Sequence, residues 1–192
     1  PYHGEFIPIQ ADLAIPQGYQ QLADAIFSLD GIVHNAGHVL YGLLQDLTVE
    51  EAERLIQVSV TSPLLLTKSL VPKLISKKEG AIVVVSSIWG QTGAAFEVAY
   101  STVKGAQISF VKALSKELAP SGIRVNAVAP GAVETPMLSG FSPDELAAVR
   151  EEIPLSRLAT PEDVANGVEF LLSKKSSYIT GQVLAINGGW HV

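Results

Sequence analysis

The sequence predicts an α/β fold, a doubly wound parallel sheet with helices on both faces. Two observations carry this prediction. Short apolar runs rich in β-branched residues alternate along the chain with longer segments of helical periodicity. In addition, residues 81–85 are apolar at every position, which is typical of a parallel strand covered on both sides. Strands and helices that alternate in this way form a sheet through right-handed crossovers.

The composition fits a single domain over residues 1–192. Hydrophobic residues make up 47% of the chain and charged residues 17%, which is enough apolar material for a substantial core. The net charge of −6 comes from interspersed acids and bases, so it indicates no nucleic-acid partner. The absence of cysteine excludes disulfides and cysteine-based metal sites, and we expect no metal. No membrane-length apolar stretch or signal-peptide pattern is present, so we expect a cytoplasmic protein without a membrane partner.

The first half of the chain predicts two strands and two helices. Residues 5–10 read as a short strand, and Pro8 favours an edge or irregular position for it. A helix is expected over residues 16–29 and a brief buried strand over residues 30–34. Thr48 and Glu51 then have the spacing of a capping box. The helix that they begin should reach about residue 75, with Pro63 inside it.

The second half predicts three strands and two further helices. Strands are expected at 81–87, 123–128 and 182–186. An amphipathic helix should span residues 98–118, because its apolar residues fall largely on one side. Residues 132–157 read as irregular or loosely helical. Thr160 caps the last helix, since Pro161 suits the first helical position and two acids follow in the first turn.

Three side chains are predicted to converge at one end of this sheet. Ser87 ends a strand, while Tyr100 and Lys104 are four residues apart and share one face of a helix. Reduction of a carbonyl by hydride needs a proton donor at the oxygen. A free tyrosine has a pKa of about 10, and a nearby ammonium lowers it. We therefore expect Tyr100 to be the general acid/base and Lys104 its electrostatic partner, although each residue alone would read as structural or solvated.

A second feature is the turn Asn35-Ala36-Gly37, which follows the predicted strand at residues 30–34. Ala36 and Gly37 carry little bulk, so a cofactor could approach the backbone closely. An ordinary strand-to-loop turn is the alternative. We interpret His34 as structural and reject a metal pair with His38, because this segment is a turn.

Five motifs now occur in one order along the chain. They are Asn35-Ala36-Gly37, Ser87, Tyr100-x-x-x-Lys104, Pro130-Gly131 with Thr135, and Thr180-Gly181-Gln182 with Gly188-Gly189. This pattern resembles the short-chain dehydrogenase/reductase family over essentially the whole chain. Within that family it looks most like the 3-oxoacyl-(acyl-carrier-protein) reductases of bacterial fatty-acid synthesis, on the stretches 126–135 and 157–163.

The resemblance implies a Rossmann-type fold and an NAD(P)H-dependent reduction of a carbonyl, such as a 3-oxoacyl thioester, to a secondary alcohol. It favours NADP, with NAD possible, and a small-molecule or acyl-carrier-bound substrate. It also implies a homotetramer, in which the subunits contact each other through the last strand and the helices that start near residues 98 and 160. Two alternatives stay open: an enzyme for another secondary alcohol (sugar, polyol or steroid), and a catalytically silent dinucleotide-fold module for binding or oligomerisation.

The resemblance also assigns roles to individual residues. Ser87 would hold the substrate oxygen, and Lys104 would bond the nicotinamide ribose as well as support Tyr100. Thr135 would bond the nicotinamide carboxamide. Residues 136–154 would form a substrate lid, which Met137, Leu138 and Phe141 make apolar. The full set of expected cofactor-binding residues is Asp12, Asn35, Ala36, Gly37, Tyr100, Lys104, Pro130, Gly131, Val133 and Thr135, with helix capping an equal alternative for Asp12.

Ser59 marks a departure from the family pattern. It stands where the family usually has a catalytic asparagine whose backbone carbonyl holds a water leading to the lysine. Pro63 has no N–H, so the Ser59 carbonyl should lose its helical donor and be free to accept from water. We therefore keep Ser59 as a fourth catalytic position and expect reduced activity.

The glycine-rich phosphate loop of the family, Thr-Gly-x-x-x-Gly-x-Gly, does not occur in this sequence. By resemblance it would precede Pro1, together with the first two strands of the sheet. We expect the native protein to include that segment, which would also choose between NAD and NADP. An intact mass near 20.3 kDa for the purified protein would contradict this expectation.

Overall fold

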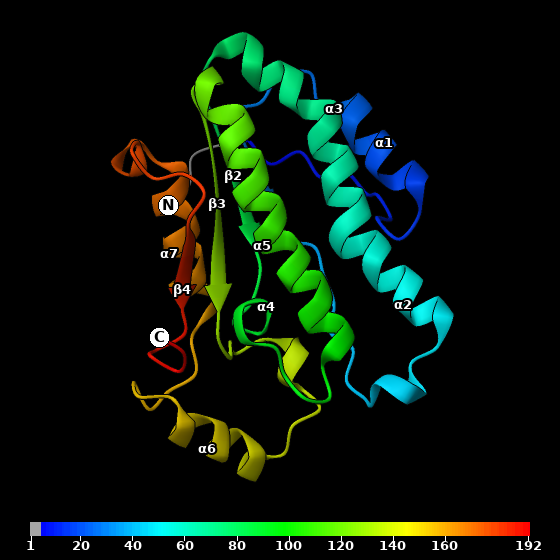
Figure 1. Ribbon diagram of the computed structural model, residues 1–192, viewed down its shortest axis with the longest axis vertical. Coiled ribbons are helices and arrows are strands. Elements are labelled where there is room, and N and C mark those ends of the chain that lie inside the picture. Colours follow the sequence, from blue (N-terminus) through cyan, green and yellow to red (C-terminus); the bar gives the residue numbers. More distant parts are fainter. Residues whose placement is uncertain (1–4) are drawn as a thin grey trace.

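The computed structural model describes residues 5–192 as a parallel sheet with helices on both faces (Figure 1). Its strands, in spatial order, are β1 (Gly31–His34), β2 (Gly80–Val85), β3 (Ile123–Pro130) and β4 (Val183–Ile186). Each neighbouring pair is parallel, so all carboxyl ends lie at one edge. That edge faces the end of the molecule where α6 lies (Figure 1). The predicted fold class is confirmed.

One face of the sheet is covered by α3 (Ser62–Lys77) and α5 (Val98–Leu118). The apolar stripes of these helices meet the sheet in the larger hydrophobic core, where burial of apolar area stabilises the fold. On its outer side α3 packs against α1 (Pro16–Ala25), which is shorter than predicted (Figure 1). The buried members of this core are Ile32, Leu66, Leu70, Leu74, Ile82, Val84, Val111, Leu118, Ile123, Val125 and Ala127.

The opposite face is covered by α7 (Pro161–Leu172), which packs on β2, β3 and β4. Thr160 caps α7, as predicted, and it also forms a capping box with Asp163. The buried core on this side is small and consists of Val83, Val128 and Leu171. Val33 of β1 remains 43% exposed there. This face is therefore only partly covered.

The strand predicted at residues 5–10 does not form. These residues lie outside any helix or strand, and all six are exposed. A strand needs a neighbour for its backbone hydrogen bonds, and Pro8 has no N–H to offer one. Within residues 5–192, β1 pairs only with β2 and forms an edge of the sheet.

The single helix predicted from Thr48 to about residue 75 consists of three parts. After the Thr48 capping box come α2 (Val49–Ile56), a π-helical segment (Gln57–Thr61) and then α3, in which Pro63 occupies the first turn. The wider turn lets the chain pass Pro63, which cannot donate. We expected no apolar stretch of membrane length, and this is wrong by length and composition, since the run Val49–Lys77 could cross a membrane. Its leucines Leu66, Leu70 and Leu74 instead contribute to the sheet core.

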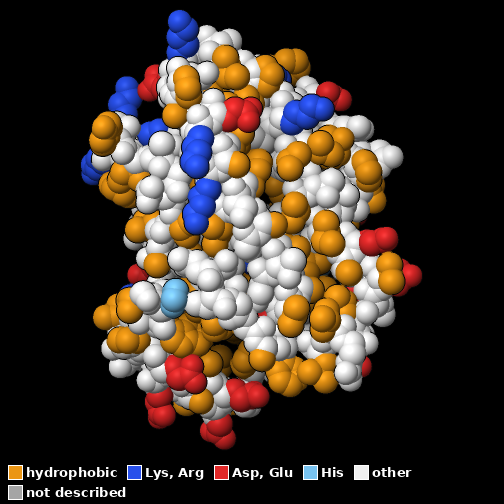
Figure 2. Space-filling view, viewed as in Figure 1, with side chains coloured by type: hydrophobic (Ala, Val, Ile, Leu, Met, Phe, Trp, Pro, Cys, Tyr) orange, Lys and Arg blue, Asp and Glu red, His pale blue; other side chains and the backbone are white. Residues whose placement is uncertain are grey.

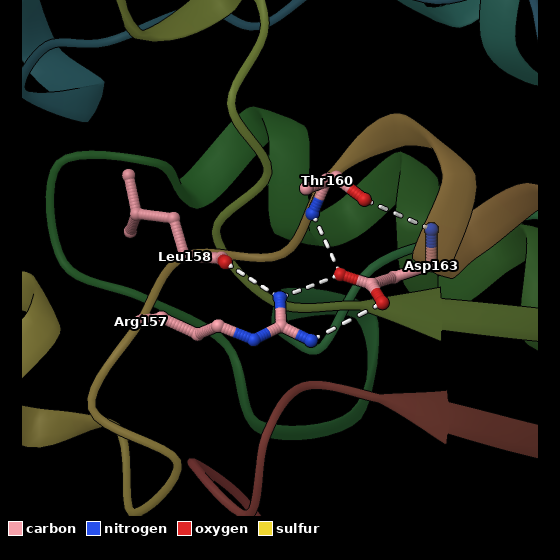
Figure 3. Close-up of polar contacts among 4 residues, drawn as sticks. All are labelled: Arg157, Leu158, Thr160 and Asp163. Carbon is pink, nitrogen blue, oxygen red and sulfur yellow. Dashed lines mark hydrogen bonds and ion pairs between the residues drawn. The ribbon is translucent and has the colours of Figure 1, made fainter.

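The remaining helical segments are short, and α6 (Pro143–Glu152) lies in the region predicted to be irregular or loosely helical. Figure 3 shows how the chain returns from α6 to α7: the Arg157 guanidinium bonds the Asp163 carboxylate at 2.6 Å and the Leu158 carbonyl at 3.0 Å. The Arg157 and Thr160 contacts hold the pKa of Asp163 well below its usual range. The other segments are α4 (Trp89–Thr92) and the 3₁₀ turns Leu44–Asp46, Ala119–Ser121, Pro136–Leu138 and Lys174–Ser176.

Candidate active site

Ser87 is placed by the continuation of β2 beyond its last residue. The Ser86 N–H donates to the Val128 carbonyl at 2.9 Å, and the Ile88 N–H donates to the Pro130 carbonyl at 3.0 Å. These bonds extend the pairing with β3 past the end of the strand. Ser87 therefore sits at the carboxyl edge of the sheet, where ligands of open α/β sheets bind.

Helix α5 is fixed against this edge at Lys104. The Ser86 hydroxyl donates to the Lys104 carbonyl at 2.9 Å. Gly90 allows close packing of α4 on α5, since a Cβ there would lie 2.7 Å from the same carbonyl oxygen. Lys104 and Tyr100 thereby face the strand end, with the Lys104 Nζ 5.4 Å from the centre of the Tyr100 ring.

A cavity of about 1190 Å³ lies beside these residues. It contains the predicted catalytic residues Ser87, Tyr100 and Lys104, and it extends over the partly covered face near Val33. The roles of these side chains stay predictions, but the structure brings them together. Eight of the ten expected cofactor-binding residues line the cavity: Tyr100 and Lys104 themselves, and Asn35, Gly37, Pro130, Gly131, Val133 and Thr135.

Three predicted site residues do not line this cavity: Asp12, Ala36 and Ser59. Asp12 is exposed, and its carboxylate accepts from the Ala14 N–H at 2.9 Å in the turn before α1. Its side chain thus organises a turn and is not the N-cap, which is Ile15.

Ser59 is 1% exposed and lies in the π-helical segment. We expected its carbonyl to lose its helical donor because of Pro63, and the structure shows a side-chain donor in that place: Gln107 of α5 donates to the carbonyl at 2.8 Å. The second lone pair of the carbonyl can still accept from water, so this part of the expectation stays a prediction. Ser59 and Gln107 each also have a buried polar atom without a hydrogen-bond partner. These atoms, the Ser59 Oγ and the Gln107 Oε1, are the only such side-chain atoms in the described part of the chain.

The pKa of Tyr100 is raised to about 12, mainly because burial disfavours the phenolate. The negative charges of Glu97 and Tyr41 act in the same direction, and a hydrogen bond with Ser87 acts against it. Our prediction of a pKa lowered by Lys104 is therefore wrong for the protein by itself. The Lys104 ammonium lies over the Tyr100 ring and donates to the Val85 carbonyl at 2.8 Å. Its attraction for a phenolate is therefore outweighed by the free-energy cost of burying that phenolate.

Burial also lowers the pKa of Lys104 to about 8. At neutral pH the phenol of Tyr100 is thus protonated and most of Lys104 is charged. Among residues 5–192, the ammonium makes one hydrogen bond, to Val85, although it carries three donors. This arrangement can give a proton to an oxygen and stabilise the anion that remains.

The three apolar residues of the predicted substrate lid over residues 136–154 lie on the cavity, and we call them the apolar wall, while the lid role stays a prediction. Met137, Leu138 and Phe141 line the cavity together with Leu146 and Val149 of α6. The Phe141 ring meets the Tyr41 ring edge-to-face, with centroids 5.8 Å apart.

Sequence reasoning missed several further residues of the cavity. Trp89 and Trp190 form an edge-to-face pair with centroids 5.2 Å apart, and Glu97 lies on the same lining. Their positions next to the recognised motifs could have indicated that they belong to the site. Trp89 follows Ser87 by two residues, and Glu97 precedes Tyr100 by three. Trp190 directly follows the two glycines at 188 and 189.

Comparison with known proteins gives one consistent family. Residues 4–191 match the family model described as enoyl-(acyl carrier protein) reductase. The oxidoreductase YmfI of Bacillus subtilis, itself uncharacterized, is 54% identical over 184 residues, which cover 95% of this chain and 76% of YmfI. The 3-oxoacyl-[acyl-carrier-protein] reductase FabG of Aquifex aeolicus is 38% identical over 187 residues, which cover 97% of this chain and 75% of FabG.

A solved structure supports the same conclusion. A Beutenbergia cavernae protein, proposed to be an NAD(P)-dependent gluconate 5-dehydrogenase and crystallised with NADP at low occupancy, superposes with a TM-score of 0.90. It is 32% identical, and the match covers 94% of this chain and 74% of that one. The sequence motifs, the parallel sheet and these matches agree, and the chain belongs to the short-chain dehydrogenase/reductase family of NAD(P)-dependent oxidoreductases.

Proposed function

We propose that this chain reduces a carbonyl group, that of a 3-oxoacyl thioester, to a secondary alcohol with NAD(P)H. The observation that carries the proposal is the shared cavity of Ser87, Tyr100 and Lys104 at the carboxyl edge of the sheet. A buried, protonated phenol there is a proton donor positioned by a serine and supported by an ammonium.

The residues beside Lys104 fit the nicotinamide end of such a cofactor. A Cβ on Gly37 would lie 3.8 Å from the Lys104 Nζ, so the backbone of that turn runs next to the ammonium. Lys104 has donors to spare for ribose hydroxyls, and the polar side chains of Asn35 and Thr135 line the same cavity. When bound, the reduced nicotinamide supplies the hydride that reaches the carbonyl carbon.

The protein's own residues handle the oxygen and the proton. The Ser87 Oγ accepts from the Trp89 N–H at 3.2 Å, which orients the hydroxyl beside Tyr100. A substrate oxygen held by Ser87 and Tyr100 gains negative charge as the hydride arrives, and Tyr100 transfers its proton to that oxygen. The phenolate left behind is stabilised by the Lys104 ammonium. The apolar wall of Met137, Leu138 and Phe141 limits access of water.

The substrate class rests on two further points. The Aquifex relative is named for 3-oxoacyl-[acyl-carrier-protein] reduction. The apolar side chains of residues 137–149 suit an acyl chain. The Beutenbergia relative, named for gluconate, motivates a rival substrate, a sugar acid.

The test is turnover of acetoacetyl-coenzyme A, followed by the loss of NADPH absorbance, with the keto form of gluconate as the rival substrate. We expect the thioester to be the better substrate. Tyr100→Phe should lower the rate at least about a hundredfold, because it removes the proton donor. Tyr178→Phe is the matched control, since Tyr178 is fully exposed. Unchanged turnover in Tyr100→Phe would show that the proton comes from another group.

A further inference from the structure

The two tryptophans and two glutamates form one side of the cavity, which we call the indole–carboxylate wall: Trp89, Glu97, Glu152 and Trp190. The Trp190 indole N–H donates to the Glu152 carboxylate at 3.2 Å. The Trp89 side chain makes a hydrogen bond with the Glu97 carboxylate. The two rings meet edge-to-face at 65°, so each indole is held by its neighbour and by a carboxylate.

Glu97 is the member of this wall closest in sequence to the reacting phenol. It is the N-cap residue of α5, three positions before Tyr100, yet its side chain makes no capping bond. The carboxylate instead bonds Trp89 and lines the cavity, half-buried. In the part of the chain that the structure describes, Glu97 takes part in no ion pair. Burial raises the pKa of Glu97, while the hydrogen bond with Trp89 and the helix dipole at this end of α5 favour its charged form.

The charges around the substrate side are predominantly negative. Among the described residues that line the cavity, Lys104 is the only lysine or arginine, and it bonds the Val85 carbonyl. Burial and the positive charge of Arg54 lower the pKa of His38, so this side chain adds little positive charge at neutral pH. Figure 2 shows acidic side chains gathered at the end of the molecule formed by α6.

An anionic group next to the reacting carbonyl would therefore meet Glu97, and the single lysine of the described lining, Lys104, is bonded to the Val85 carbonyl and is assigned to the ribose and to Tyr100. Two carboxylates a few ångströms apart in a partly desolvated cavity repel each other strongly. A neutral ester or thioester avoids this repulsion and can place its apolar part against the indole rings. The wall thus distinguishes substrates by the charge beside the ketone.

We propose that Glu97, with the Trp89–Trp190 pair, is the specificity-determining part of the site, which accepts a neutral 3-oxo ester or thioester and rejects the free 3-oxo acid. This inference rests on the function proposed above and specifies its substrate class. It assigns a role to residues that the family motifs do not include.

The test uses the tryptophan fluorescence of the full chain, because both of its tryptophans lie in the cavity. Ethyl acetoacetate and acetoacetate carry the same ketone and differ in charge. We expect a saturable fluorescence change with the ester, and binding of acetoacetate at least about tenfold weaker at low ionic strength. Glu97→Gln should tighten acetoacetate binding about tenfold and leave the ester within about twofold.

Two controls separate local charge from other effects. Glu117→Gln makes the same charge change on an exposed position of the same helix and should leave the ratio of affinities unchanged. Glu97→Asp keeps the charge and should keep the discrimination, and raised salt should reduce it in the unmodified protein. The salt series needs no variant and shows whether the discrimination is electrostatic. Where Glu97→Gln does not fold, Glu97→Ser removes the same charge with a smaller polar side chain and should also lose the discrimination.

Equal binding of both ligands by the unmodified protein would overturn the proposal. So would no fluorescence change with either ligand, or a Glu97→Gln variant that leaves the ratio as it was. The proposed reaction is tested by a separate measurement, the turnover of NADPH and its loss in Tyr100→Phe. Discrimination without turnover would contradict the reductase function alone, while Tyr100-dependent turnover without discrimination would contradict the role of Glu97 alone.

Discussion

At the residue scale, Tyr100 and Lys104 share one environment and respond to it in opposite directions. Both are buried in the cavity lining, and burial disfavours the charged form of each. The pKa of the phenol therefore rises to about 12, and that of the ammonium falls to about 8. The neutral phenol and the charged lysine, which reduction requires, coexist below pH 8.

The first prediction concerns the pH dependence of reduction. The rate with acetoacetyl-coenzyme A should be level near neutrality and fall as pH rises through about 8, because Lys104 then loses its proton. Lys104→Arg keeps the positive charge at alkaline pH, so the falling limb should move to higher pH. If the rate of Lys104→Arg fell at the same pH as that of the unmodified protein, the group that titrates would not be Lys104.

The second prediction concerns acid stability and His34. This side chain is 8% exposed, its Nε2 lies 2.7 Å from the Thr67 Oγ1, and burial lowers its pKa to about 4. The unfolded chain binds this proton at about 6.5, so folding stability is lost as pH falls from about 6.5 to about 4. The loss should be about 3 kcal/mol, from roughly 1.4 kcal/mol per pKa unit.

Urea unfolding at several acidic pH values measures this loss. His34→Gln should flatten the pH dependence between those limits, since glutamine does not titrate. His191→Gln, near the end of the chain, should leave it unchanged. An equally steep acid loss in His34→Gln would point to other buried groups.

At the element scale, the position of α5 decides whether Ser87, Tyr100 and Lys104 can meet. The helix was predicted with both ends correct, because its periodicity and the Pro120 and Gly122 stop signal are local. Its position against the sheet depends on α4, which the sequence did not predict, and on the close approach of Gly90 to the Lys104 backbone.

The third prediction tests that approach with a matched pair of glycines. A Cβ on Gly90 would lie 2.7 Å from the Lys104 carbonyl, so Gly90→Ala should destabilise the protein by about 1–3 kcal/mol and reduce turnover. A Cβ on Gly105, inside α5, would lie 3.6 Å from the Gly90 carbonyl oxygen, which is ordinary contact. Gly105→Ala should be neutral or stabilise by up to about 1 kcal/mol. Denaturant unfolding measures the stabilities of Gly90→Ala and Gly105→Ala. Equal stabilities of the two variants would contradict the close packing of Gly90 against the Lys104 carbonyl.

At the whole-molecule scale, exposed apolar side chains occur on α7, β4 and the C-terminus. Phe170 is 38% exposed, Leu184 is 36% exposed, and Val192 is fully exposed. Apolar groups that continue over neighbouring elements favour association. We propose a homotetramer that uses this surface and the start of α5.

The fourth prediction follows from that proposal. Sedimentation equilibrium should give four times the mass that intact-mass measurement gives for the single chain. Leu184→Glu should produce smaller species, because it places a charge in the interface. Leu44→Glu is the control, since Leu44 is 61% exposed in a separate 3₁₀ turn. A monomer at every concentration would contradict the proposal.

The sequence by itself determined the parallel sheet, the bounds of α5 and the meeting of Ser87 with Tyr100 and Lys104. It also predicted a strand at residues 5–10 that does not form, and it did not predict α4. Periodicity, capping residues and strand ends are local signals, and parallel strands place their carboxyl ends at one edge. Only the tertiary structure decided the direction of the Tyr100 pKa, the Gln107 bond to Ser59 and the wall that contains Glu97 and Trp190. Desolvation and contacts between distant segments depend on how the helices pack, and no local pattern in the sequence encodes them.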